Sequence, residues 1–277
     1  MNASLCFYRK HNVVVMRDGG TYEGDWLDGV CHGHSVTIYP DGQRYEGAYL
    51  NGKMSGHGAM TYPDGIRHEG EFLNDEATGH GVTSYPNGQR FEGAMRDGEP
   101  HGHGVMTWTE GQHYEGAFLN GEISGHGVMT YCDGSRYEGE LLNQEQHGRG
   151  VLTFPTGCRY EGAWLNNMQH GHGAYSWPDG QRYDGEYLND VRTGHGVMTY
   201  SNDRRYDGEW LNGVEHGHGT TTWPSGQKYN GAHVDDVRTG HGVMTYSDGR
   251  RYKGEWLNNK KTWLWCDDLS RRCTIRR

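Results

Sequence analysis

The chain has little of what an ordinary globular core requires. Only 33% of its 277 residues are hydrophobic, the mean hydropathy is −0.95, and no apolar run is long enough for a membrane span or a signal peptide. Its 6 cysteines form no C-x-x-C pair, which is typical of reduced thiols. We therefore expect a soluble, cytoplasmic protein without a conventional two-layer core.

Positive charge is also scarce. The formal net charge is −10, and no basic patch lies within the bulk of the sequence. An acidic chain of this kind repels nucleic acid and anionic membranes, so we expect no nucleic-acid partner. Only the last residues are basic, with Arg271, Arg272, Arg276 and Arg277.

Glycine and aromatic residues are abundant instead, with 46 glycines, 19 tyrosines and 9 tryptophans. Disordered segments are poor in aromatics, and the glycines do not recur every third residue as in collagen. They recur every 23 residues: "SGHGVMTYCDGSRYEGELL" from Ser124 returns as "TGHGVMTYSDGRRYKGEWL" from Thr239. From Tyr22 to Tyr252 the period never slips, which indicates a repeat protein.

Each repeat predicts a β-hairpin. The segment "HGVMTY" alternates as a strand does, a P-D-G turn follows, and "RYEGEWL" is the second strand. A loop such as "NGVEHG" then leads to the next hairpin. In the second strand, tyrosine, glycine and tryptophan face one side of the sheet while arginine and glutamate face the other. Glycine beside the rings allows them to lie across the strand and to stack edge-to-face or offset on rings of the next hairpin.

The pattern Y-E-G-x-W-x-x-G-x-x-H-G-x-G resembles the MORN repeat, the membrane occupation and recognition nexus motif. It is clearest in "YEGDWLDGVCHGHS" from Tyr22, "YEGAWLNNMQHGHG" from Tyr160 and "YDGEWLNGVEHGHG" from Tyr206. The resemblance implies an all-β fold, an elongated and twisted single-sheet meander of consecutive antiparallel hairpins with no separate globular domain. We expect an N-terminal lead at 1–10, eleven hairpins at 11–257, of which the first is degenerate, and a C-terminal cap and basic tail at 258–277.

Members of this family usually act as scaffolds that dimerise or bind other proteins, so the resemblance implies a non-enzymatic scaffold with an unidentified protein partner or a second copy of itself. The alternative is a peripheral membrane module that binds phosphoinositides, which the acidic loops disfavour. We expect no catalytic residues, because repeated identical positions do not form the unique pocket that an active site requires.

Two sets of aromatic residues are candidate interaction sites. A partner-binding groove is predicted along one row of rings, although the same rings can instead form the stacking core: Trp26, Tyr49, Phe72, Phe118, Trp164, Tyr187, Trp210 and Trp256. End-to-end assembly is predicted at Trp263, Leu264 and Trp265, where the repeat pattern breaks and these residues can cover the last hairpin. The charged stripes of arginine and glutamate are either a solvated, mutually paired face or a docking surface.

The 18 histidines, many in H-G-H-G, raise the question of a metal site. Equivalent histidines of neighbouring hairpins should lie about 10 Å apart, whereas zinc requires its nitrogen ligands at about 2 Å. We therefore expect neither a metal nor a cofactor, and we interpret these histidines as packing or hydrogen-bonding residues of the loops.

Overall fold

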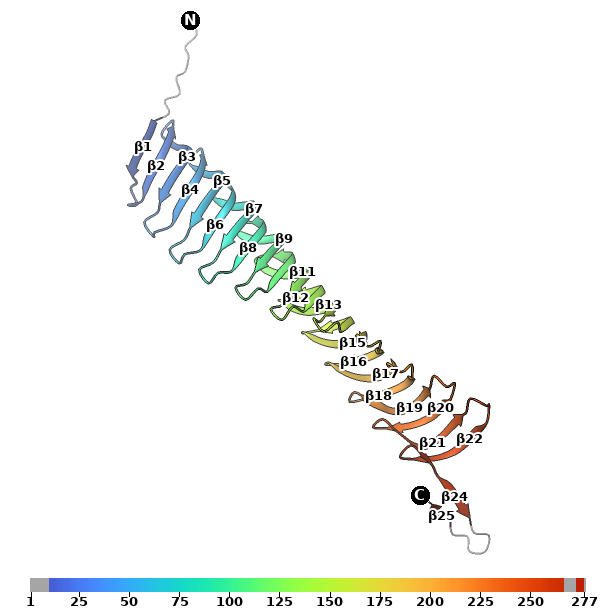
Figure 1. The fold of residues 1–277 in the computed structure, drawn as a ribbon. Helices are drawn as coiled ribbons and strands as arrows, with labels where there is room; N and C mark the ends of the chain where they lie inside the picture. Colours follow the sequence, from blue (N-terminus) through green and yellow to red (C-terminus); the bar gives the residue numbers. More distant parts are fainter. Residues whose placement is uncertain (1–9, 267–272, 277) are drawn as a thin grey trace. The chain divides into compact units, whose positions relative to one another are not determined.

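The computed structural model describes residues 10–266 and 273–276, with side chains described for 13–262. All regular elements in these ranges are β-strands, and the chain divides into two compact units at Gln144 and Glu145 (Figure 1).

The strands of the first unit are β1 (Lys10–Val15), β2 (Thr21–Leu27), β3 (Val30–Ile38), β4 (Arg44–Leu50), β5 (Lys53–Thr61), β6 (Arg67–Leu73), β7 (Glu76–Ser84), β8 (Arg90–Arg96), β9 (Glu99–Thr107), β10 (His113–Leu119), β11 (Glu122–Thr130) and β12 (Arg136–Leu142). From β1 to β12, each strand pairs with the next in antiparallel fashion.

The strands of the second unit are β13 (Glu145–Thr153), β14 (Arg159–Leu165), β15 (Met168–Ser176), β16 (Arg182–Leu188), β17 (Val191–Thr199), β18 (Arg205–Leu211), β19 (Val214–Thr222), β20 (Lys228–Val234), β21 (Val237–Thr245), β22 (Arg251–Leu257), β23 (Lys260–Lys261), β24 (Trp263–Cys266) and β25 (Cys273–Arg276). From β13 to β23 the pairing is again consecutive and antiparallel, while β24 and β25 form a separate two-stranded sheet. The predicted all-β meander of consecutive hairpins is confirmed.

The predicted reversal at the P-D-G position is present. In the turn after β11, the amide of Gly134 donates to the carbonyl of Tyr131 at 2.9 Å, and the amide of Tyr131 donates to the carbonyl of Ser135 at 2.8 Å. Gly134 has φ +84°, the left-handed conformation that glycine adopts at no steric cost. Asp133 accepts a hydrogen bond from the amide of Ser135, which stabilises the turn from its side chain.

The predicted loop between hairpins is much shorter than the sequence indicates. In "NGVEHG", only Asn212 and Gly213 form the connection, and β19 already begins at Val214. Both residues have positive φ, at 51° and 84°, which is the two-residue hairpin turn whose twist matches that of the strands. The expectation of a longer loop was wrong because the glycine of the H-G pair lies inside a strand.

The glycine of the H-G pair, Gly217 in this repeat, lies in a β-bulge. Gly208 pairs with Gly219 and Trp210 with Glu215, so the three residues between Glu215 and Gly219 stand opposite a single residue. Gly217, the middle one, has φ +62°. The histidines that we expected in loops are therefore strand residues flanking a bulge, which is a recurrent feature of both units.

Burial alternates along the strands as predicted. In β12 the tyrosine and glycine positions are buried and the arginine and glutamate positions are exposed. Tyr206 is fully buried, and its ring lies over the opposed Gly208 and Gly219, where a Cβ atom would collide with the phenol. Its hydroxyl donates to the carbonyls of Glu209 at 2.9 Å and His216 at 3.2 Å, which closes the bulge.

Candidate functional site

The face to which the tyrosines point is called the aromatic face. Its deepest row consists of the fully buried tyrosines, and the predicted groove residues form the second row. Seven of these eight are buried, with exposures between 3% for Phe118 and 7% for Tyr49, and Trp26 is partly buried. These rings therefore form much of the core of the array.

The two rows interleave in an edge-to-face ladder. The ring of Trp210 lies 5.5 Å from that of Tyr206 and 5.1 Å from that of Tyr183, at interplanar angles of 82° and 83°. Its indole nitrogen donates to the carbonyl of Gly196 at 3.1 Å. Contacts of this kind contribute about 0.5–1.5 kcal/mol each beyond the area they bury. The expected edge-to-face stacking is confirmed. The predicted groove rings contact rings of the deepest row, which are tyrosines except for His68 beside Phe72 and Phe91 beside Phe118.

A third row on the same face is the one that sequence reasoning missed. It holds an aromatic residue just before each P-D-G-type turn, at a strict 23-residue spacing: Tyr39, Tyr62, Tyr85, Trp108, Tyr131, Phe154, Trp177, Tyr200, Trp223 and Tyr246. Tyr62 is 38% exposed and the others are partly buried. The signal was visible in the sequence as the aromatic that precedes D-G in the consensus.

In the first unit, a hollow of about 380 Å³ lies beside this row and is mainly apolar. Tyr39 lines it, and its hydroxyl lies 3.2 Å from that of Tyr49, which also contacts the hydroxyl of Thr37 at 2.9 Å. Burial raises the pKa of Tyr49 above its ordinary value, so the phenol stays neutral and serves only as a hydrogen-bonding group. Cys31, Met54 and Met16 complete the apolar part of the wall.

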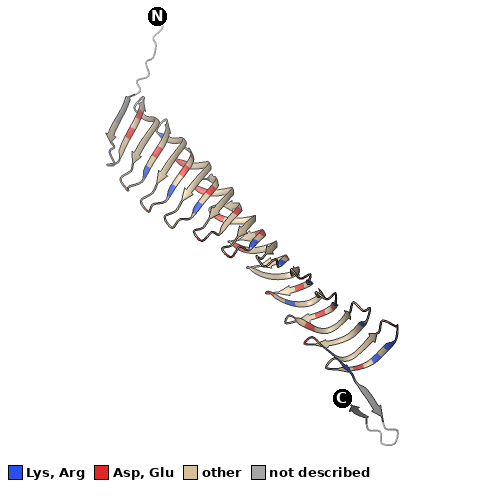
Figure 2. Cartoon of the chain, viewed as in Figure 1, with Lys and Arg blue, Asp and Glu red and all other residues tan. Residues whose placement is uncertain are grey.

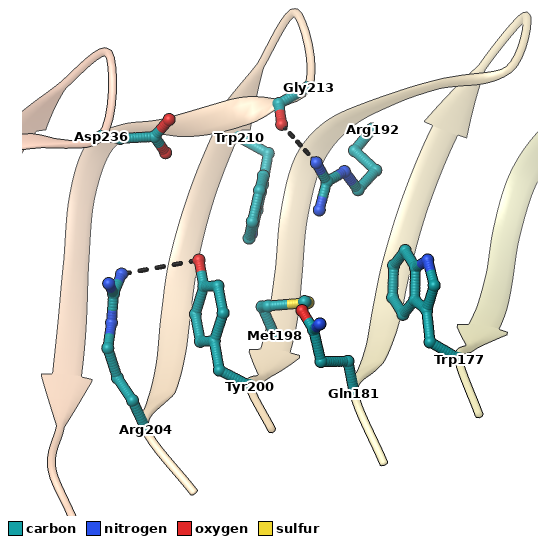
Figure 3. A pocket seen from close by; sticks show the side chains of 9 residues that line it. All are labelled: Trp177, Gln181, Arg192, Met198, Tyr200, Arg204, Trp210, Gly213 and Asp236. Atoms are coloured by element: carbon teal, nitrogen blue, oxygen red, sulfur yellow. Dashed lines mark hydrogen bonds between the residues drawn. The ribbon is translucent and has the colours of Figure 1, made fainter. Parts of the chain in front are cut away.

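In the second unit, a hollow of about 470 Å³ is lined by aromatic and basic side chains (Figure 3). Trp177, Tyr200 and Trp210 provide the rings, and Arg192 and Arg204 provide the positive charge. A second hollow of about 310 Å³ includes Arg204, Trp223 and Arg238. The predicted groove residue Trp210 thus borders a hollow. Most of the other residues that line this hollow belong to rows that were not predicted from the sequence.

The arginines of these hollows stack on the rings. The guanidinium of Arg192 lies 4.6 Å from the ring centre of Trp210, and that of Arg238 lies 4.9 Å from that of Trp256. Arg204 lies 4.4 Å from the ring centre of Tyr200. Such cation–π contacts hold the charged ends in place against the sheet.

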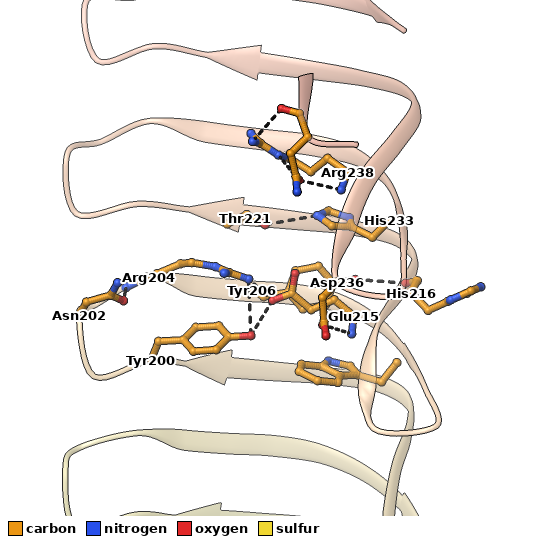
Figure 4. A network of polar contacts seen from close by, with 12 residues as sticks. Tyr200, Asn202, Arg204, Tyr206, Glu215, His216, Thr221, His233, Asp236 and Arg238 are labelled. Carbon is orange, nitrogen blue, oxygen red and sulfur yellow. Dashed lines mark hydrogen bonds and ion pairs between the residues drawn. The ribbon is translucent and has the colours of Figure 1, made fainter. Parts of the chain in front are cut away.

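A buried polar network joins the two hollows (Figure 4). Glu215 is 1% exposed and forms an ion pair with Arg204, while the hydroxyl of Tyr200 donates to the same carboxylate at 2.6 Å. Burial raises the pKa of Glu215, and the partners Tyr200 and Arg204 act in the opposite direction. The amide of Glu215 donates to the carboxylate of Asp236 at 2.8 Å.

The opposite face carries the charged stripes, and Figure 2 shows the acidic and basic bands recurring along successive hairpins of each unit. Arginine and acid pair within one strand, as Arg136 does with Glu138 at 2.7 Å and Arg182 with Asp184 at 2.7 Å. Both partners are about half exposed, so each pair stabilises the fold by at most ~1 kcal/mol. This is the solvated, mutually paired arrangement.

The histidine rows do not converge. His195 lies 3.2 Å from Asp207, which also pairs with Arg205, and His241 lies 2.8 Å from Glu255. In the part of the chain with described side chains, no group of three or more His, Cys, Asp or Glu residues could hold a metal ion. Over the same residues, no helix is long and apolar enough to cross a membrane.

The predicted assembly segment can be followed only as backbone. Trp263, Leu264 and Trp265 belong to β24, which pairs with β25. Their side chains lie outside the described residues, so their assembly role stays a prediction.

Comparison with solved structures finds chains of low similarity. The wild-type TCP10 domain of Danio rerio CPAP has 17% identity and a TM-score of 0.43, and the match covers 72% of this chain and 94% of that one. The SAS-4 TCP domain of Drosophila melanogaster, solved in complex with a proline-rich motif of Ana2, has 11% identity and a TM-score of 0.37, with coverage of 68% and 95%. A comparison with curated proteins gives no significant match.

The family comparison is decisive. The MORN repeat model matches eleven consecutive segments: 22–44, 45–67, 68–90, 91–113, 114–136, 137–159, 160–182, 183–203, 206–228, 229–250 and 252–262. This repeat is a non-enzymatic module of interaction with proteins or membranes. Each segment begins at or near a ladder position, where Tyr22 starts the first and Tyr252 the last. The chain therefore belongs to the MORN-repeat family.

Proposed function

We propose that this chain is a non-enzymatic scaffold that holds a segment of another protein along its aromatic face. The observation that carries the proposal is the third aromatic row, whose partly exposed rings border hollows on both units. Partly exposed aromatic rings in a hollow are what protein interfaces use as anchors. On the opposite face the charges are solvated and paired with one another, and exposed leucines such as Leu188 and Leu211 lie at the strand ends, beside no aromatic row.

The ladder beneath supports this function mainly as the core of the array, although Trp210 and Tyr49 border the hollows. Rings such as Tyr206 and Trp210 are 0% and 4% exposed, so they offer little surface for binding. Removing one of them removes core contacts. The third row is different because Trp177 and Trp223 keep part of their surface open to solvent. Binding energy and folding energy therefore reside largely in different rows of the same face.

A displayed library of random 16-residue peptides, selected on the full chain, tests the proposal. Trp177→Ala and Trp223→Ala should each weaken the selected peptides at least tenfold, because an aromatic anchor in an interface contributes about 2 kcal/mol or more. Each variant must keep the β-sheet circular dichroism of the unchanged protein.

Arg182→Ala, on the opposite face, is the matched control and should leave binding unchanged. Absence of specific peptides, or peptides that lose affinity with Arg182→Ala and keep it with both tryptophan variants, would contradict the proposal.

A further inference from the structure

We propose that the aromatic face of the second unit binds an extended acidic peptide, whose carboxylates meet Arg192, Arg238 and Lys261. This inference rests on the proposed function and specifies the chemistry of the partner. It derives from one position of the repeat, the second residue after the two-residue turn, where the residue type changes along the chain.

In the first unit this position is apolar, and in the second it is polar or charged. The successive residues are Cys31, Met54, Ala77, Pro100 and Ile123, then Gln146, Gln169, Arg192, Glu215, Arg238 and Lys261. The fold is the same throughout, because Met54 pairs with Tyr49 in the same register as Glu215 with Trp210. The hairpin therefore does not require charge here, and the change of residue type must have another cause.

Three cations of this row have no carboxylate partner among the described residues. Arg192 donates to the carbonyl of Gly213 at 2.8 Å, and Arg238 donates to the side-chain oxygen of Asn259 at 3.1 Å. The ammonium of Lys261 lies 4.8 Å from the ring centre of Tyr246. Neutral partners and rings position these cations while leaving their charge uncompensated.

The acidic groups nearby are already engaged. Glu215, the one acidic member of the row, pairs with Arg204 and accepts the hydroxyl of Tyr200. Asp236 borders both hollows and accepts the amide of Glu215. Like charge from Arg204 and Arg238 contributes to the lowered pKa of His233, although burial is the larger cause. Together the two hollows are lined by three arginines and two acidic residues, a small excess of positive charge within a chain of net charge −10.

A peptide fits this arrangement better than a nucleic acid does. The guanidinium groups of Arg192 and Arg238 cover the faces of Trp210 and Trp256, so these two rings offer no stacking surface to a base. A long polyanion would also meet the acidic residues of the neighbouring turns, such as Asp190 and Asp235. A short extended chain can instead place single carboxylates on single cations, and its other side chains can contact Trp177 and Trp223.

The spacing of the repeat sets the spacing of the acidic residues. Arg192 and Arg238 are two hairpins apart, or about 19 Å at roughly 4.8 Å per strand. An extended peptide spans about 3.3 Å per residue, so its carboxylates should be about six residues apart. Lys261 is one hairpin further and takes a third acidic residue about three positions on.

Parallel selections of the displayed peptide library test the inference. On the unchanged full chain, selected peptides should be enriched in Asp and Glu at two positions about six residues apart. The same selection on the Arg192→Gln/Arg238→Gln double variant should give peptides without that enrichment. The matched control is Arg182→Gln/Arg205→Gln on the opposite face, which should retain it.

The best peptide, labelled with fluorescein, provides the quantitative readout. Its Kd should rise at least tenfold in the double variant and at least tenfold between 50 and 300 mM NaCl, because charge-assisted contacts are lost or screened. Arg192→Lys/Arg238→Lys retains the charges and should retain the acidic preference. This variant also keeps the test valid if the glutamine variant does not fold.

Each other outcome has a definite meaning. Groove-binding peptides with no acidic enrichment would overturn this inference and leave the scaffold function intact. Failure to obtain any peptide that depends on Trp177 or Trp223 would overturn both. A 20-residue oligothymidylate that binds more tightly than the best peptide, and depends on Arg192 and Arg238, would replace the acidic peptide with single-stranded nucleic acid.

Discussion

At the scale of single residues, His233 shows how the ladder accepts a polar ring. It stands where the flanking hairpins have Trp210 and Trp256, is 1% exposed, and lies edge-to-face with Tyr206 at 5.0 Å and Tyr229 at 5.2 Å. Its Nδ1 donates to the carbonyl of Gly231, and its Nε2 accepts the hydroxyl of Thr221. Both ring nitrogens of the neutral imidazole thus have hydrogen-bond partners, and the ring keeps the edge-to-face position that tryptophan occupies in the flanking hairpins.

This burial predicts a pH dependence. The pKa of His233 is lowered to about 4, mainly by burial. The unfolded chain, with a histidine pKa of about 6.5, binds the proton first, so stability falls as pH decreases from about 6.5 towards 4. Relative to His233→Phe, the unchanged protein should lose about 2 kcal/mol of unfolding free energy between pH 7.5 and 5.

Urea unfolding at several pH values measures this difference. Glu215, whose pKa is raised, acts with the opposite sign at lower pH, but it is present in both proteins and cancels in the comparison. Parallel stability profiles of the two proteins would show that His233 does not titrate in this way.

At the scale of the element, each hairpin contains glycines with different physical roles. Gly185 faces its cross-strand partner, and a Cβ there would lie 2.5 Å from the Cα of Gly196 and 2.6 Å from the hydroxyl of Tyr183. Gly180, in the turn of the same hairpin, has φ +87° and open space around it. Asp203 occupies the equivalent turn position of the next hairpin with φ +60°. The turn position therefore requires a left-handed backbone conformation, whereas the strand position beneath the tyrosine ring requires a residue without a side chain.

Two substitutions in this hairpin separate these roles. Gly185→Ala should lower the free energy of unfolding by at least about 2 kcal/mol. The new methyl group would collide with the backbone of Gly196 and the ring of Tyr183, neither of which can move freely. Gly180→Asn should cost less than about 1 kcal/mol, since asparagine tolerates the left-handed region. Chemical denaturation measures both, and equal losses would contradict this division.

At the scale of the whole molecule, the period of 23 residues was enough to predict the hairpins, their order and the faces of the side chains in the second strand of each hairpin. Tyr206 and Gly208 repeat without a shift, so register could be determined by counting. The short turn at Asn212 was missed because the following Gly217 is typical of a loop, whereas its positive φ belongs to a bulge inside β19.

The rows of the candidate site were harder to predict than the fold. Alternation assigns Trp210 and Tyr200 to the same face, but it cannot tell which ring lies deeper. Depth depends on the bulge and on the opposed glycines, which place Trp210 between two tyrosines and leave Tyr200 at the edge. The change of residue type from Met54 to Arg192 at one repeat position is visible in the sequence. The stacking of the cations at this position on aromatic rings is visible only in the structure.

The measurement that tests the central claim most directly is hydroxyl-radical footprinting of the full chain, with and without its best selected peptide. We predict that oxidation of Trp177, Tyr200 and Trp223 decreases at least threefold on binding. The exposed Leu188 and Leu211, which are 53% and 46% accessible on the other face, should react equally in both states. Protection of these leucines with unchanged oxidation of the three aromatic residues would show that the partner binds the opposite face.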